Sequence, residues 1–446
     1  MNARRFVAGT ALAIAAVIAP GFAPIGASAV TAPQSDAFYK PPAGYAAKAP
    51  GTILRSRPVT LAAFAALPQK VQAWQVMFRS TNYAGKPTAA VTTLLRPEDG
   101  TPKAVISYQV AEDASAPQCA PSYVMRPAAA PGEAINQAEI AIIDAAVADG
   151  FDVSMPDYEG LAGDFGAARQ PAYIELDGLR AAEHFAPLGL VGGKATPVAL
   201  WGYSGGSLAS GWGAQLQPRY APDLNLRGVA VGGFVTNIEQ ALIKINGGFA
   251  AGLVPSALPG ILRSTPKLES AIAPYLTAKG KAILAKSGSQ CEIANVSQYP
   301  FYNVNDYLTV PLAKLLARPA IRRAINGLNL GGTTPKAPLF VYHAINDELI
   351  PVAGPDAIVP KYCKAGDSVT YTRDSLSEHA VLAVSGAPAA LAWLHARLTG
   401  GPVPHGCTTT TVATMALTAT AIAQEPEVVT SILTGLAGLP IGPGDF

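Results

Sequence analysis

The five residues Gly202-Tyr203-Ser204-Gly205-Gly206 constrain the fold of this chain more than any other stretch. They fit the pattern G-x-S-x-G, with a β-prone run (197–201) before them and a helical run (207–215) after them. Glycine at both ends of the pattern avoids Cβ clashes where a strand turns at once into a helix. The context therefore favours a nucleophile elbow, a strained turn that exposes the Ser204 hydroxyl above a sheet. The alternative is a glycine-rich turn that carries no chemistry.

Strand-like and helix-like segments alternate on both sides of this turn. The sequence predicts strands at 71–79, 89–95, 104–110, 151–156, 226–231, 339–343 and 369–373, and helices at 138–149, 172–185 and 387–398. Alternation of this kind is typical of a mostly parallel sheet covered by helices on both faces. Half of the residues are hydrophobic and 14% are charged, which is enough for a large core. The predicted fold class is therefore α/β.

One long segment interrupts the alternation. Residues 234–331 contain short helical stretches, Pro-Gly breaks and no clear strand, so we interpret them as a helical cap inserted into the sheet domain. The predicted organisation is a signal peptide (1–29), the first part of the core (30–233), the cap (234–331), the second part of the core (332–405) and a C-terminal segment (406–446) that packs on the rest.

The N-terminus has the pattern of an export signal. Arg4 and Arg5 precede an apolar run (6–18), and Ala27-Ser28-Ala29 is a small-residue cleavage site, so the mature chain is expected to begin near Val30. A transmembrane anchor is the alternative, but the run is short and stops at Pro20. The sequence therefore predicts a secreted, extracellular protein. The net charge of +2 gives no electrostatic footprint for nucleic acid.

The four cysteines, Cys119, Cys291, Cys363 and Cys407, lie far apart and form no CxxC pair. This spacing argues against a zinc or redox site. Because an exported chain meets an oxidising environment, two disulfides are expected. Four cysteines allow three connectivities, and spacing alone does not choose among them.

A serine nucleophile needs a base, and in this fold the order along the chain is serine, acid, histidine. His379 follows a predicted strand and a short polar loop, which is where such a base belongs. The other four histidines fit less well: His184 precedes Ser204, His343 lies inside a strand before any candidate acid, His395 lies within a helix, and His405 borders a Pro-rich loop. We therefore predict that His379 is the base.

The acid should follow a strand between Ser204 and His379. Asp347 meets this condition, since it follows the strand 339–343; the neighbouring Glu348 is easily confused with it. Three other carboxylates lie in turn-like stretches and are weaker candidates, namely Asp356, Asp367 and Asp374. Asp347 would fix the tautomer of the histidine, whose other nitrogen takes the serine proton. No HExxH or comparable cluster suggests a metal, and no cofactor is implied.

An acyl-transfer site also needs donors for the oxyanion. One is expected to be the N–H of Gly205, the residue after the nucleophile. The second should come from the loop after the strand 104–110, which reads Ala111-Glu112-Asp113-Ala114-Ser115. No HGGG motif is present in that loop, and the pattern alone does not choose the donor.

Several motifs together resemble the secretory lipase family typified by the yeast lipase A. These are Ser107-Tyr108-Gln109-Val110 with Glu112-Asp113-Ala114, Cys119-Ala120-Pro121-Ser122-Tyr123, the elbow, Asn246-Gly247-Gly248, His343-Ala344-Ile345 with Asp347-Glu348, and Glu378-His379. The resemblance runs from about residue 36 to the C-terminus.

The resemblance implies an α/β-hydrolase core with a helical cap and a C-terminal flap. It implies a triad of Ser204, Asp347 and His379, and it assigns Asp113 and Gly205 to the oxyanion hole. It also implies the disulfides Cys119–Cys291 and Cys363–Cys407. The implied activity is hydrolysis of acylglycerols and other carboxylic esters. We expect the protein to meet a lipid or ester substrate at a transient lipid–water interface, and we predict no stable protein partner.

Asp113 poses a physical question, because an ionised carboxylate would repel an oxyanion. Either its backbone N–H donates, or its side chain is protonated and donates. Short-chain carboxylesterase and acyltransferase activities would use the same triad, and both remain alternatives to a lipase. A non-catalytic binding protein on a hydrolase scaffold is a further alternative, although such proteins usually lose a triad member.

Overall fold

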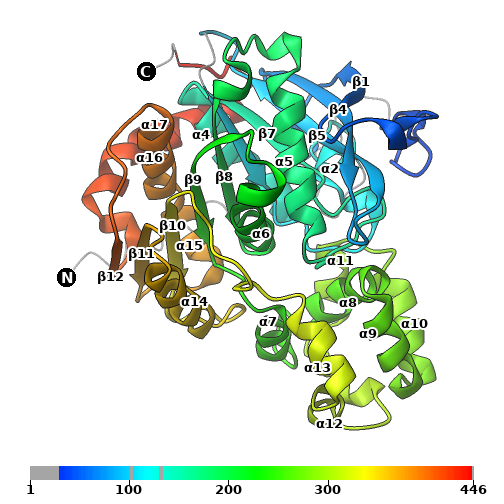
Figure 1. Ribbon diagram of the computed structural model, residues 1–446. Helices are drawn as coiled ribbons and strands as arrows, with labels where there is room; N and C mark the ends of the chain where they lie inside the picture. Colours follow the sequence, from blue (N-terminus) through cyan, green and yellow to red (C-terminus); the bar gives the residue numbers. More distant parts are fainter. Residues whose placement is uncertain (1–29, 101–103, 130–133, 444–446) are drawn as a thin grey trace.

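A computed structural model describes residues 30–100, 104–129 and 134–443, and its centre is one ten-stranded sheet (Figure 1). The predicted signal peptide lies outside the described residues. The strand order is β1-β4-β5-β7-β6-β8-β9-β10-β11-β12. From β7 to β12 all neighbours are parallel, whereas the pairs β1–β4, β4–β5 and β5–β7 are antiparallel. The strands are β1 (Ile53–Pro58), β4 (Gln72–Thr81), β5 (Pro87–Arg96), β6 (Val105–Gln109), β7 (Asp152–Pro156), β8 (Pro197–Tyr203), β9 (Asn225–Gly232), β10 (Leu339–Ala344), β11 (Val369–Asp374) and β12 (Cys407–Val412).

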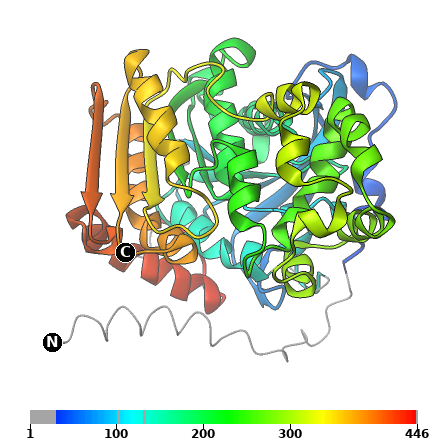
Figure 2. The ribbon, with the colours of Figure 1, turned by 90° about the horizontal axis from the view of Figure 1, so that it is seen from below.

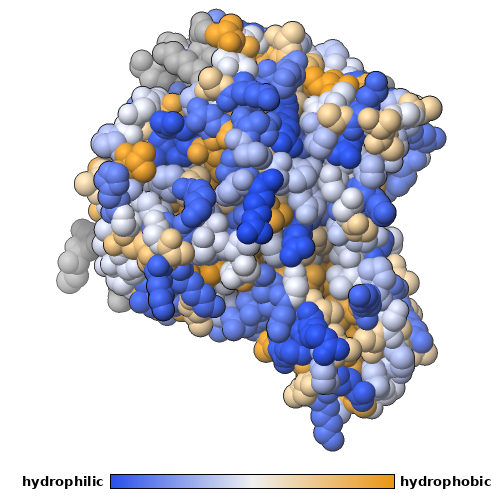
Figure 3. Space-filling model, viewed as in Figure 1, coloured by the Kyte–Doolittle hydropathy of each residue, from blue (hydrophilic) through white to orange (hydrophobic). Residues whose placement is uncertain are grey.

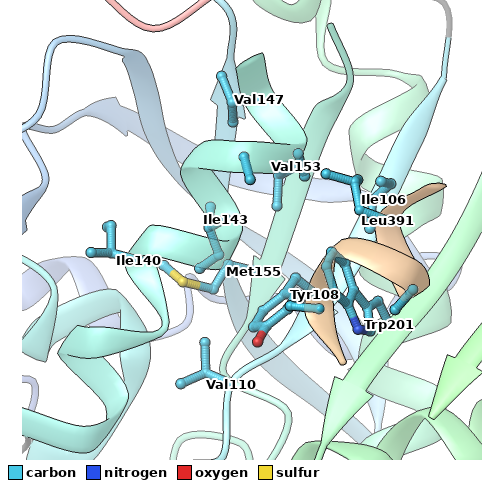
Figure 4. Packing of buried hydrophobic residues seen from close by; sticks show 14 of the residues in the cluster. Ile106, Tyr108, Val110, Ile140, Ile143, Val147, Val153, Met155, Trp201 and Leu391 are labelled. Atoms are coloured by element: carbon cyan, nitrogen blue, oxygen red, sulfur yellow. The ribbon is translucent and has the colours of Figure 1, made fainter. Parts of the chain in front are cut away.

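The central strands are buried on both faces, as helices on both sides of a parallel sheet require. Successive residues of each strand enter two different clusters. On one face, Ile106, Tyr108 and Trp201 pack against α4 (Ile140–Ala148) and α16 (Ala387–Leu398), as Figure 4 shows. On the other face, residues such as Val105 and Val198 pack against α5 (Gln170–Glu183), α6 (Gly205–Tyr220) and α14 (Ala353–Lys364).

Between β9 and β10 the described chain forms helices and no strand of the sheet. They project from the core as a separate lobe (Figures 1 and 3), which corresponds to the predicted cap. The cap helices are α7 (Ile238–Ile245), α8 (Leu253–Ser264), α9 (Pro266–Ile272), α10 (Ala278–Ser287), α11 (Glu292–Gln298), α12 (Leu312–Leu316) and α13 (Pro319–Asn326). Their apolar faces meet one another and also Leu208 and Trp212 of α6. Exposed basic residues such as Lys314 and Arg323 lie on α12 and α13.

The C-terminal segment joins the sheet as well as packing on it. β12 pairs in parallel with β11 at one edge, which Figure 2 shows from below, and α17 (Ala419–Leu436) packs on α4 and α16. The sequence pattern did not predict β1, β12, α14 or α17. Among the described residues, no single helix is long and apolar enough to span a membrane, although the bent pair α15 (His379–Ser385) and α16 passes by length and composition.

Two disulfides are present, and their pairing is the one that the resemblance implied. Cys119–Cys291 joins the loop after β6 to the start of α11, across 172 residues of sequence. Cys363–Cys407 joins α14 to β12 across 44 residues. The first disulfide therefore connects the core to the cap, and the second connects the core to the C-terminal segment.

Candidate active site

Ser204 lies at the turn between β8 and α6, with φ 52° and ψ −123°, so its backbone is in the strained left-handed half of the map. Two neighbouring glycines make the turn possible. A Cβ on Gly202 would come within 2.2 Å of the Gly206 carbonyl oxygen, and one on Gly206 within 1.9 Å of the Gln109 carbonyl oxygen. The Ser204 N–H donates to the Gly232 carbonyl oxygen at 3.0 Å. The turn is therefore an elbow that fixes the serine at the carboxyl edge of the sheet.

His379 begins α15 and lies between the other two predicted triad members. Its Nε2 is 2.8 Å from Ser204 Oγ, and its Nδ1 is 2.7 Å from Asp347 Oδ2. Its main chain is held as well: the His379 N–H donates to Glu348 Oε2 at 3.0 Å, and the Tyr203 hydroxyl donates to the His379 carbonyl oxygen at 2.6 Å. The structure thus brings Ser204, His379 and Asp347 into one hydrogen-bonded row.

Asp347 lies in the loop just after β10 and is buried. Its Oδ1 accepts the N–H groups of Leu349 and Ile350 at 2.9 and 2.7 Å, which leaves Oδ2 for His379. Burial on its own raises the pKa of Asp347. The hydrogen bond from His379, the charge of His379 and the Ile350 N–H outweigh burial and lower that pKa below its usual value. Asp347 is therefore ionised and can stabilise a protonated histidine.

His343 has a structural role that the sequence pattern did not reveal. It is fully buried in β10, where its Nδ1 accepts the Phe234 N–H at 2.9 Å and its Nε2 donates to the Ile350 carbonyl oxygen at 3.0 Å. Burial lowers its pKa, so the ring is neutral and ties the Asp347 loop to the start of the cap. Of the remaining histidines, His184 and His395 bond to Arg180 and Asp149 at the surface, and His405 is exposed.

Asp113 lies in the loop between β6 and the first disulfide, opposite the elbow. It is buried and has φ 36°, which is rare for a residue other than glycine. A Cβ on Gly205 would come within 1.8 Å of Asp113 Oδ1, so this oxygen lies directly against the residue after the nucleophile. Asp113 Oδ1 has no hydrogen-bond partner within the part of the chain that the structure describes. Burial raises the pKa of Asp113 to about 6, although the charge of His379 and its own backbone N–H act in the opposite direction.

A buried carboxyl group supports the beginning of this loop. Glu139 accepts the Ala111 N–H at 2.9 Å and the Tyr108 hydroxyl at 2.7 Å. Burial raises the pKa of Glu139 to about 8, so the group holds its proton near neutral pH.

Gly205 is the first residue of α6, whose leading N–H groups have no partners within the helix. Hydrogen-bonding groups of Gly205 and Asp113 therefore lie close to each other beside Ser204. Within the described residues, no group of three or more His, Cys, Asp or Glu side chains could hold a metal ion.

Comparison with known proteins gives the same architecture. Residues 126–406 match the model of the family described as secretory lipase. The crystal structure of Candida antarctica lipase A aligns with a TM-score of 0.79 and 27% identity, over 93% of this chain and 99% of that one. This match and the mostly parallel sheet confirm the predicted α/β-hydrolase fold.

Three similar relatives cover most of the chain. Lipase A of Arthroderma benhamiae is 38% identical over 94% of this chain and 91% of the relative. A probable inactive lipase of Mycobacterium tuberculosis is 37% identical over 90% and 91%, respectively. A secreted triacylglycerol lipase of Malassezia globosa is 32% identical over 97% and 96%. With the family match and the fold in agreement, the chain belongs to the secretory lipase family.

Proposed function

We propose that this protein is a triacylglycerol lipase that cleaves carboxylic esters through an acyl-enzyme on Ser204. His379 removes the serine proton as Oγ attacks the ester carbonyl, and then protonates the leaving alcohol. Asp347 holds the His379 tautomer and stabilises its charged form. Water, activated by the same histidine, releases the fatty acid. The observation that carries this proposal is the unbroken row Ser204 Oγ–His379 Nε2 and His379 Nδ1–Asp347 Oδ2, at 2.8 and 2.7 Å.

We assign the oxyanion hole to Gly205 and Asp113. The Gly205 N–H supplies one donor at the start of α6. For Asp113, the partnerless Oδ1 against Gly205 and the raised pKa support donation by a protonated side chain below about pH 6. Donation by the Asp113 N–H is the alternative, and it would be independent of that proton.

Lipid esters are the proposed substrate class, met at a lipid–water interface. The relatives named as lipases support this class. Large apolar side chains are also exposed on or near α15 and on the cap: Leu376, Val384 and Leu417 in the first region, and the edge-on ring pair Phe249 and Phe301 in the second. We propose further that residues 234–331 act as the cap over this site, between core parts 30–233 and 332–405, that residues 406–446 form the C-terminal flap, and that residues 1–29 direct secretion.

The first test is hydrolysis of p-nitrophenyl esters from acetate to palmitate and of emulsified triolein, with Ser204→Ala as the matched control. Hydrolysis of long esters and of the emulsion that disappears in the control would support a lipase. Hydrolysis of short soluble esters alone would favour a carboxylesterase. If wild type and Ser204→Ala were equally inert, the hydrolase proposal would fail.

Two alternatives call for separate measurements. An acyltransferase would give a new ester in place of free acid when an alcohol is added, which product analysis detects. One relative is named a probable inactive lipase, so the hypothesis of a non-catalytic binding protein also needs a test. A fluorophosphonate probe labels Ser204 only if His379 activates it, and the absence of label on a folded wild type would favour the binding protein.

A further inference from the structure

We infer that Ser256, on cap helix α8, is a positioning residue that holds the Asp113 backbone in place for the oxyanion hole. The inference rests on the proposed function, because it concerns the same site. It assigns a role in transition-state stabilisation to a residue that does not touch the substrate.

The central contact is a buried hydrogen bond between cap and core. Ser256 Oγ donates to the Asp113 carbonyl oxygen at 2.8 Å, and neither residue is open to solvent beyond 8%. The direction is unambiguous, since a carbonyl oxygen can only accept. Ser256 therefore bonds to the main chain of Asp113, whose left-handed backbone is strained and needs support from neighbouring groups.

A second side chain orients the Ser256 hydroxyl. Asn295 Nδ2 on α11 donates to Ser256 Oγ at 3.1 Å, so the proton of the hydroxyl is left to point at Asp113. Asn295 is itself fully buried and also donates to the Ser287 carbonyl oxygen at 3.2 Å. Asn295, Ser256 and Asp113 thus form one chain of donors and acceptors that runs from the cap into the oxyanion loop.

Ser115 of the oxyanion loop forms further hydrogen bonds with helix α8. Ser115 Oγ donates to the Ser256 carbonyl oxygen at 2.6 Å and accepts the Gly260 N–H at 2.9 Å. Those two groups are four residues apart, the spacing of partners in one helical turn, so the loop hydroxyl inserts into α8. A Cβ on Gly260 would come within 2.4 Å of the Phe165 N atom, which shows how closely the helix approaches the core.

Two further links hold α8 and α11 against the core, one at the end of the oxyanion loop and one at the loop after β7. The Cys119–Cys291 disulfide joins the end of the loop to the residue that caps α11. Arg263 of α8 bonds through Nε to Asp164 Oδ1 at 2.7 Å and through Nη2 to the Ala162 carbonyl oxygen at 2.7 Å. This part of the cap is therefore a fixed wall of the site, and Ser256 is the point where it meets the oxyanion-hole residue.

The test compares Ser256→Ala with Ser264→Ala. Ser264 is buried on the same helix, but its hydroxyl bonds only to the Ile261 carbonyl oxygen of its own turn, at 3.2 Å. On soluble p-nitrophenyl butyrate, Ser256→Ala should lower kcat about tenfold or more with KM within about twofold, because the loss falls on the transition state. Asn295→Ala should lower kcat less, and Ser264→Ala should match wild type within about twofold.

Amide hydrogen exchange of peptides covering residues 110–118 gives a readout that does not depend on hydrolysis. Exchange should be faster in Ser256→Ala than in wild type and unchanged in Ser264→Ala. If Ser256→Ala matches Ser264→Ala in both kcat and exchange, or if it raises KM alone, the inference is overturned. If wild type hydrolyses no ester, the proposed function fails, and the exchange rates still decide whether Ser256 holds the loop.

Discussion

The triad and the oxyanion loop face each other across the candidate site, but different parts of the molecule hold them. Ser204, Asp347 and His379 follow β8, β10 and β11, and continuous parallel pairing from β8 to β11 sets their spacing. Asp113 lies on a loop that the cap holds, through Ser256 and the Cys119–Cys291 disulfide. In the proposed mechanism, the sheet therefore positions the groups that activate Ser204, whereas one of the two oxyanion donors, Asp113, is held by the cap.

The largest expected effect is on the sheet side. Asp347→Asn should lower kcat on p-nitrophenyl butyrate by about 10,000-fold with little change in stability. The amide oxygen would accept the Leu349 and Ile350 N–H groups, so the NH2 group would face His379 Nδ1 and favour the wrong tautomer. Asp356→Asn is the control. Asp356 of α14 forms a partly exposed ion pair with Arg373 of β11, so this variant should keep kcat within about twofold of wild type. A loss under about tenfold in Asp347→Asn would refute the triad assignment.

The two disulfides provide the next contrast. Replacing Cys119 and Cys291 by Ala should lower kcat about tenfold, because the link between cap and oxyanion loop is lost. Replacing Cys363 and Cys407 should leave kcat nearly unchanged, since that bridge joins α14 to the edge strand β12.

Both disulfide variants should lose stability. The chain-entropy model gives roughly 5 kcal/mol for the longer loop and roughly 4 kcal/mol for the shorter one, as upper figures. Thermal unfolding and kcat, measured on the same preparations, separate the two effects. Equal kcat in both variants would show that the disulfide to the cap does not support catalysis.

A smaller effect distinguishes the two roles of Asp113. Burial raises the pKa of Asp113 to about 6, so wild type loses the side-chain proton as pH rises through that value. If the side chain donates to the oxyanion, Asp113→Asn keeps a donor at every pH, and the ratio of its kcat/KM to that of wild type should rise severalfold between pH 5 and pH 8. A ratio that is constant with pH would assign donation to the backbone N–H.

The smallest effect concerns the support of the oxyanion loop by Glu139. Its pKa in the folded protein, about 8, lies above the ordinary value of 4.5, so the folded state binds the proton more tightly. This contribution to stability is complete below about pH 4 and is lost as pH rises toward 8. Glu139→Gln has no proton to lose, so its Tm should gain a few degrees on wild type between pH 5 and pH 9. A constant difference in Tm would contradict the raised pKa.

The sheet side of the site could be predicted from sequence because each of its parts has a local signal. Ser204 lies between glycines that a tight strand-to-helix turn requires, and Asp347 and His379 follow apolar runs that read as buried strands. Chain order then left few candidates. The two edge strands, β1 and β12, were not predicted because they lack such a signal. The Thr-rich β12 is exposed at the sheet edge and lacks the apolar run or alternation that marks a buried strand.

The cap side could be predicted only in outline. Short helices without strands marked the cap, but Ser256 is one serine of an amphipathic helix, 143 residues from Asp113, and nothing local marks its partner. His343 was set aside as a strand residue, whereas its two ring nitrogens join the acid loop to the cap. Contacts of this kind depend on how the cap packs against the core. The local pattern of residues does not reveal that packing.

The left-handed backbone at Ser204 has a consequence for the evolution of this chain. A non-glycine residue in that region costs about 1–3 kcal/mol, and every folded copy carries this cost. Replacement by glycine would remove the proposed nucleophile and relieve the strain in one step. Selection for stability therefore favours glycine at this position. Loss of the hydrolytic activity would leave nothing to oppose that replacement. Only continued need for the hydroxyl retains a serine there.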